Sequence, residues 1–518
     1  MTKNIFITAL AFFAITANAQ SPSDKLWHLQ PYSKTGNSGI GLEEAKELVK
    51  GKTPETVIVA IADAGVDIEH PDLKTMLWTN KDEIPDNGID DDNNGYIDDV
   101  YGWNFCGETT FDNMELTREY ARLNAKYELQ IRHLTNVAEY NRYLELKEKY
   151  LKEHEEAKQT FGILELIMGG MEALEENHGE EMTIEEVQNH PPRNKKEQIA
   201  KNILLANAKR SKDPFDFKAL KDEMQEGYDH YDFMYNYAYN ANFDPREKKV
   251  GDDYANATET GYGNNKVYYG ERFSNHGTHV AGIVAADASN DFGAEGICQS
   301  CEIMSIRNVP EGDERDKDVA NAIRYAADNG AKIVNMSFGK GYAYRPEVVQ
   351  DAIRYAESKG VLLIHAAGNS GQNNDESDNF PNDNNDAYNN WIEVGASNWE
   401  EKPAALAVFS NYGKQEVDLF APGVAIYSTT PEGQYEAFDG TSMASPVVAG
   451  VAAFVWSYYP TLTAAQLKEI LVNSAIPIKG RNRIPGSRRK KGVKKLSKTG
   501  GEVNLPAALI LAELMLNK

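Results

Sequence analysis

The chain has 518 residues, of which 41% are hydrophobic and 26% charged, and its formal net charge is -25. This length and composition are sufficient for a large core in one elaborated domain or in two domains. The acidic excess argues against nucleic acid or an anionic membrane as a partner, because both are bound through clustered positive charge.

An export signal is predicted at the start of the chain. Lys3 precedes an apolar stretch at residues 5–16, and Ala17-Asn18-Ala19 is a small-residue cleavage pattern. The apolar stretch is too short for a stable transmembrane helix. We therefore expect residues 1–19 to be a signal peptide and the mature protein to be exported, to a periplasm or to the extracellular space, without membrane insertion.

The first predicted strand covers residues 56–62. This run (TVIVAIA) is continuously apolar and rich in β-branched residues, which is typical of a strand buried on both faces of a sheet. Asp63 follows it directly. Open α/β sheets place their sites at the carboxyl ends of such strands, so Asp63 is a candidate site residue.

An acidic loop comes next. Several of its oxygen-bearing residues match the start of an EF-hand-type calcium loop, which has a glycine at the sixth place. These candidate ligands are Asp90, Asp92, Asn94, Tyr96 (through its carbonyl) and Asp98. The twelfth place holds Tyr101 instead of a glutamate, which excludes a complete EF-hand. A structural calcium turn with a further ligand from Asp86 or Asp99 and a plain acidic turn both remain open.

Residues 107–249 are predicted to form a helical insertion. Glycine is scarce there, and apolar residues fall at three- and four-residue spacing, which is typical of an amphipathic helix. These are Leu116, Tyr120, Leu123, Tyr127, Ile131 and Leu134. Thr183 to Glu186 is a predicted capping box, and Gly169-Gly170 and Pro191-Pro192 are predicted breaks between helices. The segment is expected to be a helical hairpin or small bundle, which could shade a cleft, bind a partner or only extend the surface.

The second half of the chain alternates strands and helices. Residues 275–282 predict the opening of a small-residue helix with His276 in its first turn. Buried strands are predicted at 332–338 and 361–367, and helices at 318–330 and 347–360. Asn369 follows the strand at 361–367, again at a carboxyl end.

Residues 440–446 (GTSMASP) precede another small-residue helix and place Ser442 at its exposed start. Backbone N–H groups there are unpaired and stabilise negative charge. Serine is a weak nucleophile unless a base takes its proton, and an imidazole base needs a carboxylate to orient it. Asp63, His276 and Ser442 supply these three groups.

In the order Asp63, His276 and Ser442, these segments resemble the subtilisin-like serine peptidases, the subtilases. The resemblance covers residues 27–104 and 250–515. It implies a three-layer, doubly wound, mainly parallel α/β fold, interrupted by the helical insertion. It also implies that Asp63 is the orienting acid, His276 the general base, Ser442 the nucleophile and Asn369 a side-chain donor to the oxyanion.

Further roles follow from the same resemblance. Ser337, Phe338 and Gly339 would pair with an extended peptide substrate by β-augmentation. His279 would be structural. The family's acid is usually followed by Ser or Thr, whereas this chain has Ala64. We expect the loss of that hydroxyl to make the surroundings of the acid less well optimised for catalysis, without abolishing activity.

The expected protein is a secreted serine endopeptidase that cleaves proteins through an acyl-enzyme intermediate and needs no cofactor for catalysis. The alternative is a non-catalytic binding protein that uses the helical insertion on the same scaffold. The expected boundaries are 20–106 and 250–518 for the catalytic domain and 107–249 for the insertion. The short lead-in at residues 27–51 is expected to pack on the catalytic domain, which would fold without a cleaved inhibitory pro-domain.

Three smaller predictions complete the sequence reading. A Cys298–Cys301 disulfide is expected, with a bridge from Cys106 to either of them as the competing pairing. The basic stretch at residues 479–498 is expected to be a solvated loop. Acidic residues at 375–378 suggest the hypothesis of an acidic specificity pocket that favours Arg or Lys on the acyl side of the cleaved bond.

Overall fold

A nine-stranded sheet forms the centre of the larger of two compact units, counted over the residues that the computed structural model describes. The described residues are 25–31, 39–128, 136–211, 214–290, 292–383, 387–399 and 405–517. The predicted signal peptide, together with Ile131 and Leu134 of the predicted insertion helix, lies outside them. One unit contains Phe111–Asp244, and the other contains the described parts of Gln20–Thr110 and Pro245–Lys518.

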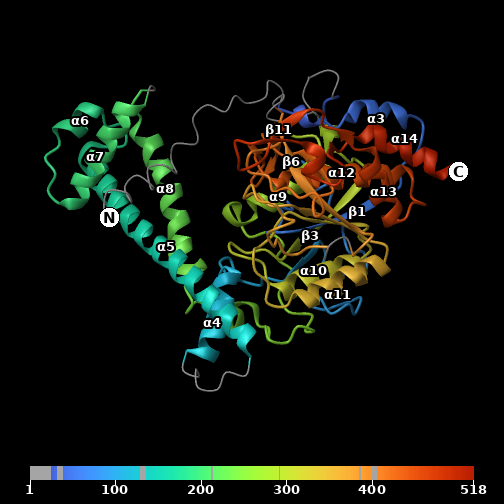
Figure 1. The fold of residues 1–518 in the computed structure, drawn as a ribbon, viewed down its shortest axis with the longest axis horizontal. Coiled ribbons are helices and arrows are strands. Elements are labelled where there is room, and N and C mark those ends of the chain that lie inside the picture. Colours follow the sequence, from blue (N-terminus) through green and yellow to red (C-terminus); the bar gives the residue numbers. More distant parts are fainter. Residues whose placement is uncertain are drawn as a thin grey trace. The chain divides into compact units, whose positions relative to one another are not determined.

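The sheet has the order β10-β13-β7-β6-β5-β4-β1-β3-β2 and is parallel except for the pair β10 and β13. Figure 1 labels β1, β3 and β6 of this sheet. Its strands are β1 (Val57–Asp63), β2 (Gly102–Asn104), β3 (Cys301–Arg307), β4 (Ile333–Met336), β5 (Leu362–Ala366), β6 (Trp391–Ser397), β7 (Leu419–Pro422), β10 (Ile476–Pro477) and β13 (Gly501–Glu502). The chain passes from β3 across β1 to β4. Such a reversal of strand order is where open α/β sheets place their sites.

Strand β1 shows why the fold has three layers. Its alternate side chains enter two different cores, with Val59 and Ile61 in one and Ala60 and Ala62 in the other. A strand with both faces covered requires an uninterrupted apolar run, which the sequence supplies. The predicted three-layer, mainly parallel α/β fold is confirmed.

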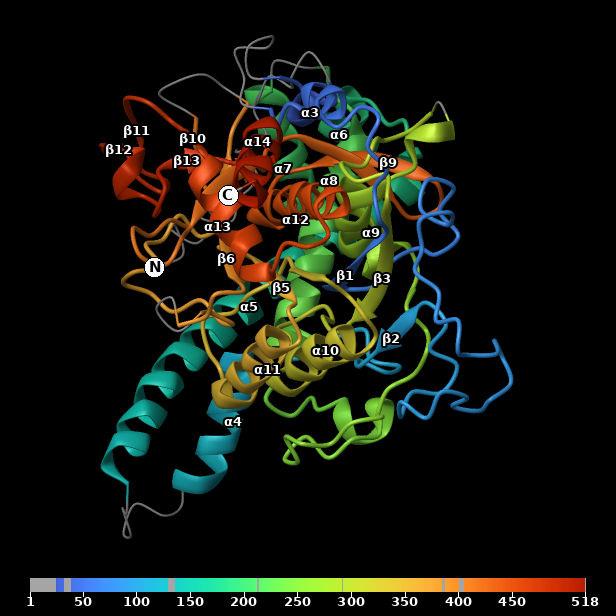
Figure 2. The same ribbon diagram turned by 90° about the vertical axis from the view of Figure 1, so that its right-hand side faces the viewer.

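Helices cover both faces of the sheet (Figure 2). The first core contains residues of α3, α9, α12, α13 and α14, and the second contains residues of α10 and α11. Their bounds are α3 (Leu42–Leu48), α9 (Glu271–Ala285), α10 (Asp316–Asp328), α11 (Pro346–Ser358), α12 (Thr441–Tyr458), α13 (Ala464–Ser474) and α14 (Leu505–Leu516). None of the helices within the described residues is long and apolar enough to cross a membrane.

The lead-in segment packs on this unit, as predicted. A short 3-10 turn, η1 (Trp27–Leu29), places the fully buried Trp27 indole where its N–H donates to the carbonyls of Val424 and Ala425 at 3.1 and 3.2 Å. Two small hairpins complete the unit. They are β8 (Ile426–Thr430) with β9 (Gln434–Phe438), and β11 (Arg481–Arg483) with β12 (Lys490–Gly492). The second lies in the basic stretch, which was predicted to be a loop.

The unit Phe111–Asp244 is helical. Its elements are α4 (Glu115–Tyr127), α5 (Val137–His178), α6 (Ile184–Asn189), α7 (Lys195–Arg210), α8 (Phe217–Phe233) and a π-helical turn (Met234–Ala238). It has its own core, in which Met171, Leu174 and Ala200 are fully buried. The capping box of Thr183 and Glu186 and the break at Pro191-Pro192 between α6 and α7 are confirmed. A role of this unit in binding a partner stays a prediction.

The predicted break at Gly169-Gly170 is wrong, because α5 continues through both glycines. A Cβ atom on Gly170 would lie 2.3 Å from the carbonyl oxygen of Lys196 and 2.8 Å from the Cβ of Ala200. Gly170 therefore permits close contact between α5 and α7 and does not end a helix.

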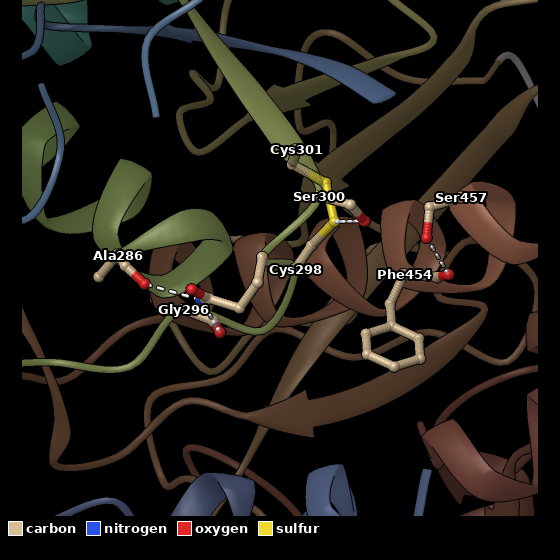
Figure 3. Close-up of a disulfide and its surroundings, with 8 residues drawn as sticks. Ala286, Gly296, Cys298, Ser300, Cys301, Phe454 and Ser457 are labelled. Carbon is tan, nitrogen blue, oxygen red and sulfur yellow. Dashed lines mark hydrogen bonds between the residues drawn. A yellow bond between two sulfur atoms is a disulfide. The ribbon is translucent and has the colours of Figure 1, made fainter. Parts of the chain in front are cut away.

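The Cys298–Cys301 disulfide is confirmed and closes the turn that leads into β3 (Figure 3). The Cα atoms are 5.6 Å apart, within the range that a disulfide spans. Gln299 Nε2 donates to the carbonyls of Ala286 and Gly296, which fixes the same turn beyond the end of α9. Cys106 is buried and takes no part in the bridge, so the competing pairings are wrong.

Candidate active site

Asp63 and His276 are in contact at the carboxyl end of the sheet. Asp63 is the last residue of β1, and its Oδ1 lies 2.8 Å from Nδ1 of His276. The prediction that His276 lies in a first helical turn is wrong, since α9 begins at Glu271. An acidic residue in the first turn favours this earlier start. Gly277 allows the approach, because a Cβ there would lie 2.2 Å from the carbonyl oxygen of Gly65.

The surroundings of His276 favour its protonated form. Desolvation alone would lower its pKa, but the charge of Asp63 and the hydrogen bond to it outweigh that effect and raise the pKa of His276 above 6.5. The His276 side chain is 40% exposed, whereas that of Asp63 is 2% exposed. The imidazole is thus held from behind by a buried carboxylate and is open to solvent in front.

The acid itself is incompletely hydrogen-bonded. Asp63 Oδ1 accepts the N–H of Ala64 at 2.7 Å in addition to His276. Asp63 Oδ2 is buried and has no hydrogen-bond partner among the described residues. The resemblance stated above implies a Ser or Thr hydroxyl beside this acid, whereas this chain has Ala64.

Ser442 lies in the first turn of α12. Pro446, one turn later, leaves the Ser442 carbonyl free to bond with a residue outside the helix. Proline has no N–H, so the carbonyl of Ser442, four residues earlier, loses its usual helical partner. Ser337, just after β4, donates its hydroxyl to that carbonyl at 2.8 Å. The Ser442 hydroxyl in turn donates to the carbonyl of Ser337 at 3.1 Å.

Helices α9 and α12, which carry His276 and Ser442, pack against each other. No hydrogen bond joins these two side chains in the described part of the chain, because the Ser442 hydroxyl is directed to Ser337. A rotation about the Cα–Cβ bond of Ser442 would have to release this bond before the hydroxyl could donate to His276.

Two residues that sequence reasoning missed extend this network. Ser445 on α12 donates to Asn335 Oδ1 at 2.7 Å, and Asn335 Nδ2 donates to Ser337 Oγ at 2.9 Å. All three are buried between β4 and α12. The signal in the sequence was an asparagine inside an otherwise apolar strand, since buried amides need partners.

Asn369 lies just beyond β5, as predicted, and is oriented by α12. Its Oδ1 accepts the N–H and the hydroxyl of Thr441 at 2.8 and 2.9 Å. A Cβ atom on Gly440 would lie 3.6 Å from Asn369 Nδ2 and 3.5 Å from the backbone nitrogen of Ser442. The missing side chain of Gly440 thus leaves a space that two N–H donors border, which is the arrangement that an oxyanion requires.

The predicted substrate segment continues from β4. Ser337 is bonded to Ser442, and the Phe338 ring lies edge-on to His365 with centroids 6.2 Å apart. A Cβ on Gly339 would lie 2.8 Å from Oδ1 of Asn379. The next residue, Lys340, forms an antiparallel bridge with Phe380.

His279 occupies a structural position. Its ring is fully buried and stacks on Phe438, with centroids 4.2 Å apart. Its Nε2 bonds to the carbonyl of Glu436 at 3.1 Å. Burial lowers the pKa of His279 to about 3, so the ring is neutral and supports the β8–β9 hairpin.

The acidic loop brings together a set of carboxylates that only partly matches the predicted calcium ligands. Oxygens of Glu83, Asp90 and Asp92 lie within 4.8 Å of one another. Oxygens on opposite sides of one calcium ion are about 5 Å apart, so this spacing fits. Glu83 was not among the predicted ligands.

The remaining predicted ligands make hydrogen bonds within the loop, as Asp90 and Asp92 also do with the N–H groups of Asn94 and Gly95. Asn94 Oδ1 accepts the N–H of Tyr96, and the two oxygens of Asp98 accept the N–H groups of Asn87 and Gly88. The Tyr96 ring is buried, with its centroid 5.0 Å from that of Trp103, which anchors the loop to the second core.

Comparison with known proteins gives a consistent result. The family model described as "Subtilase family" matches residues 55–502. The thermophilic serine proteinase of Bacillus sp. (strain AK1) is 42% identical over 185 residues, which cover 36% of this chain and 43% of that protein. Subtilisin DY of Bacillus licheniformis is 36% identical over 202 residues, covering 39% and 70%. Thermitase of Thermoactinomyces vulgaris is 37% identical over 206 residues, covering 40% and 68%.

The chain thus spans between 43% and 70% of the length of these three relatives. Among solved structures, the protease domain of PatA is 26% identical, with 47% of this chain and 82% of that domain covered and a TM-score of 0.39. The prenylagaramide maturation protease PagA is 28% identical, with coverage of 46% and 82% and a TM-score of 0.38.

Proposed function

Because the chain belongs to the subtilase family of serine endopeptidases, we propose that it cleaves peptide bonds of proteins through an acyl-enzyme formed on Ser442. The observation that carries the proposal is the 2.8 Å contact between Nδ1 of His276 and Oδ1 of the buried Asp63. His276 lies on α9, which packs against α12, the helix that carries Ser442. The contact with Asp63 supplies an oriented base, and the neighbouring helix carries a serine in its first turn.

In this mechanism the Ser442 hydroxyl first breaks its hydrogen bond to the carbonyl of Ser337. It then gives its proton to His276, and its oxygen attacks the substrate carbonyl carbon. His276 then gives the proton to the leaving amine, and water repeats the two steps on the acyl-enzyme. Asp63 stabilises the imidazolium. Asn369 Nδ2 and the N–H of Ser442 stabilise the oxyanion, which would occupy the space beside Gly440.

Labelling with a fluorophosphonate tests this function, because the reagent reports an activated serine. We expect labelling of the wild-type protein and none of Ser442→Ala, whose peptidase turnover should fall about a million-fold. Circular dichroism would show that both proteins are folded. Absence of labelling in folded wild-type protein would contradict the endopeptidase and favour a binding protein on this scaffold.

We also propose that the protein is exported. The signal-peptide pattern supports this, and so does the Cys298–Cys301 disulfide, because disulfides persist mainly in oxidising compartments. Fractionation of the producing cells with N-terminal sequencing of the mature protein tests it. A cytoplasmic protein that keeps residues 1–19 would contradict the proposal.

Catalysis in this family needs no cofactor, and we propose that calcium has a structural role only. Glu83, Asp90 and Asp92 would hold the ion, which would neutralise their crowded charges and fix the loop that follows Asp63 in the chain. Calorimetric titration with calcium, on wild type and Glu83→Gln, tests the site. We expect binding to wild type with a raised melting temperature, and neither in the variant.

A further inference from the structure

An acidic cavity of about 240 Å³ lies in the catalytic unit. Five of the residues that line it are carboxylates, and no lysine, arginine or histidine lines it in the described part of the chain. The five are Asp375, Glu376, Asp378, Glu393 and Glu416. The sequence hypothesis included three of them and missed Glu393 and Glu416, which are distant in the chain.

The wall of the cavity is hydrogen-bonded to the segment that precedes the proposed oxyanion donor, Asn369. Asn374 and Asn379, which also line it, both donate their side-chain N–H to the carbonyl of Ala367, at 2.9 and 3.1 Å. Ala367 lies two residues before Asn369. The wall of the cavity is therefore attached to the turn that carries Asn369.

The same wall reaches the predicted substrate segment. Asn379 Oδ1 lies 2.8 Å from the place where Gly339 would carry a Cβ atom. Asn379 also lines the cavity, so the cavity wall lies close to Gly339, which has no side chain. A peptide paired with residues 337–339 would direct the side chain that precedes the cleaved bond to this wall.

The negative charge of the cavity is only partly compensated. Glu393 is 4% exposed, and its Oε2 accepts hydrogen bonds from His365 at 2.9 Å and Trp391 at 3.1 Å. Its Oε1 accepts none from the described residues. Lys498, the nearby cation, is 3.0 Å from Asp418 and is thus already paired.

Glu416 shows the effect of this crowding. Burial and the charges of Asp383 and Glu393 raise the pKa of Glu416 to about 7. Its position is fixed, because Asp375 accepts the backbone N–H groups of Lys414, Gln415 and Glu416. The loop thus holds a carboxylate in the cavity against electrostatic repulsion.

We propose that this cavity binds the side chain of arginine or lysine on the acyl side of the cleaved bond, so that the enzyme cuts after basic residues. The proposal rests on the proposed endopeptidase function. A guanidinium or ammonium group has only donors, which match a wall of acceptors. An apolar side chain would bring no donor to Oε1 of Glu393, which accepts no hydrogen bond from the described residues, and a site built to bind a donor rejects ligands that lack one.

Matched peptide substrates that differ only in arginine, lysine, norleucine or phenylalanine before the cleaved bond test the proposal. We expect kcat/KM for arginine and lysine to exceed that for norleucine by about tenfold or more, because one hydrogen bond to a charged group changes a rate or binding constant by about that factor. Glu416→Gln should lower kcat/KM for the arginine peptide by about tenfold. The ratio of kcat/KM for the arginine peptide to that for the phenylalanine peptide should therefore fall.

Glu347→Gln is the matched control, because Glu347 is exposed and pairs with Arg345 outside the cavity. Fluorophosphonate labelling of each variant separates the two proposals. Intact labelling with a preference for norleucine or phenylalanine would overturn the cavity assignment and leave the endopeptidase standing. Absence of labelling in folded wild-type protein would overturn the endopeptidase itself.

Discussion

Asn369 receives both of the hydrogen bonds to its side-chain oxygen from one residue, Thr441. The backbone N–H of Thr441 donates at 2.8 Å and its hydroxyl at 2.9 Å. A carboxamide whose oxygen is held in this way has its amino group directed to the opposite side. The residue that precedes the proposed nucleophile therefore also orients the proposed oxyanion donor.

Replacement of Thr441 by valine should lower kcat. The valine side chain keeps the shape of threonine but loses the hydroxyl donor, so Asn369 would be held by one hydrogen bond. We expect kcat to fall about tenfold, because the loss of one hydrogen bond typically changes a rate constant by about that factor, and we expect little change in KM. Thr441→Ser keeps the hydroxyl and should retain activity. Equal kcat values for the valine and serine variants would show that the Thr441 hydroxyl does not position Asn369.

Gly440→Ala should weaken catalysis by filling the space beside the two donors. The backbone at Gly440 is extended, with φ of 160°, so alanine can adopt it. The added methyl would lie 3.5 Å from the nitrogen of Ser442 and 3.6 Å from Asn369 Nδ2. We expect kcat to fall about a hundredfold, as when an oxyanion donor is removed. An unchanged melting temperature would show that the loss is not one of folding.

The pH dependence should report the Asp63–His276 pair. The proposed base must be neutral, so kcat/KM should rise with pH through the raised pKa of His276, above 6.5. Asp63→Asn removes the charge that raises this pKa, so the acid limb should move to lower pH. The same change should lower kcat about 10,000-fold, because the amide favours the wrong tautomer. If the acid limb of the pH profile does not move in this variant, a group other than His276 is responsible for it.

The sequence correctly placed those candidate site residues that lie at the ends of strongly patterned elements. Asp63 and Asn369 follow apolar strands, and Ser442 opens a helix of small residues, so the local pattern fixes their place. Glu83 and Asn335 could not be found in this way. Their partners are brought to them by loop and sheet contacts that leave no periodic signal in the sequence.

The glycines of the helical unit also show that tertiary contacts cannot be predicted from local sequence preference. Gly169-Gly170 predicted a helix end from propensity, whereas α5 continues because α7 packs closely there. Tertiary contact overrides the weak preference of glycine against helices. The small-residue motif at residues 275–282 predicts a helix that starts too late, because α9 already begins at Glu271.

Two glycines of α5 should respond to alanine in opposite directions. A Cβ on Gly162 would meet no atom within 4 Å, so Gly162→Ala should only remove chain entropy from the unfolded state. We expect it to raise the unfolding free energy by about 0.5 to 1 kcal/mol. Gly170→Ala would place a Cβ 2.3 Å from the backbone oxygen of Lys196, and α5 and α7 would have to separate. We expect that variant to lose about 1 to 3 kcal/mol.

Hydrogen exchange measured by mass spectrometry, on full-length protein carrying Ser442→Ala to prevent self-cleavage, checks both changes. Peptides from α5 and α7 should exchange faster in Gly170→Ala and more slowly in Gly162→Ala, while peptides from the sheet should not change. Such a result would assign Gly170 to helix packing, because both substitutions add the same methyl to the same helix and differ only in what the methyl meets. Equal protection in the two variants would mean that α7 does not pack against α5 at Gly170.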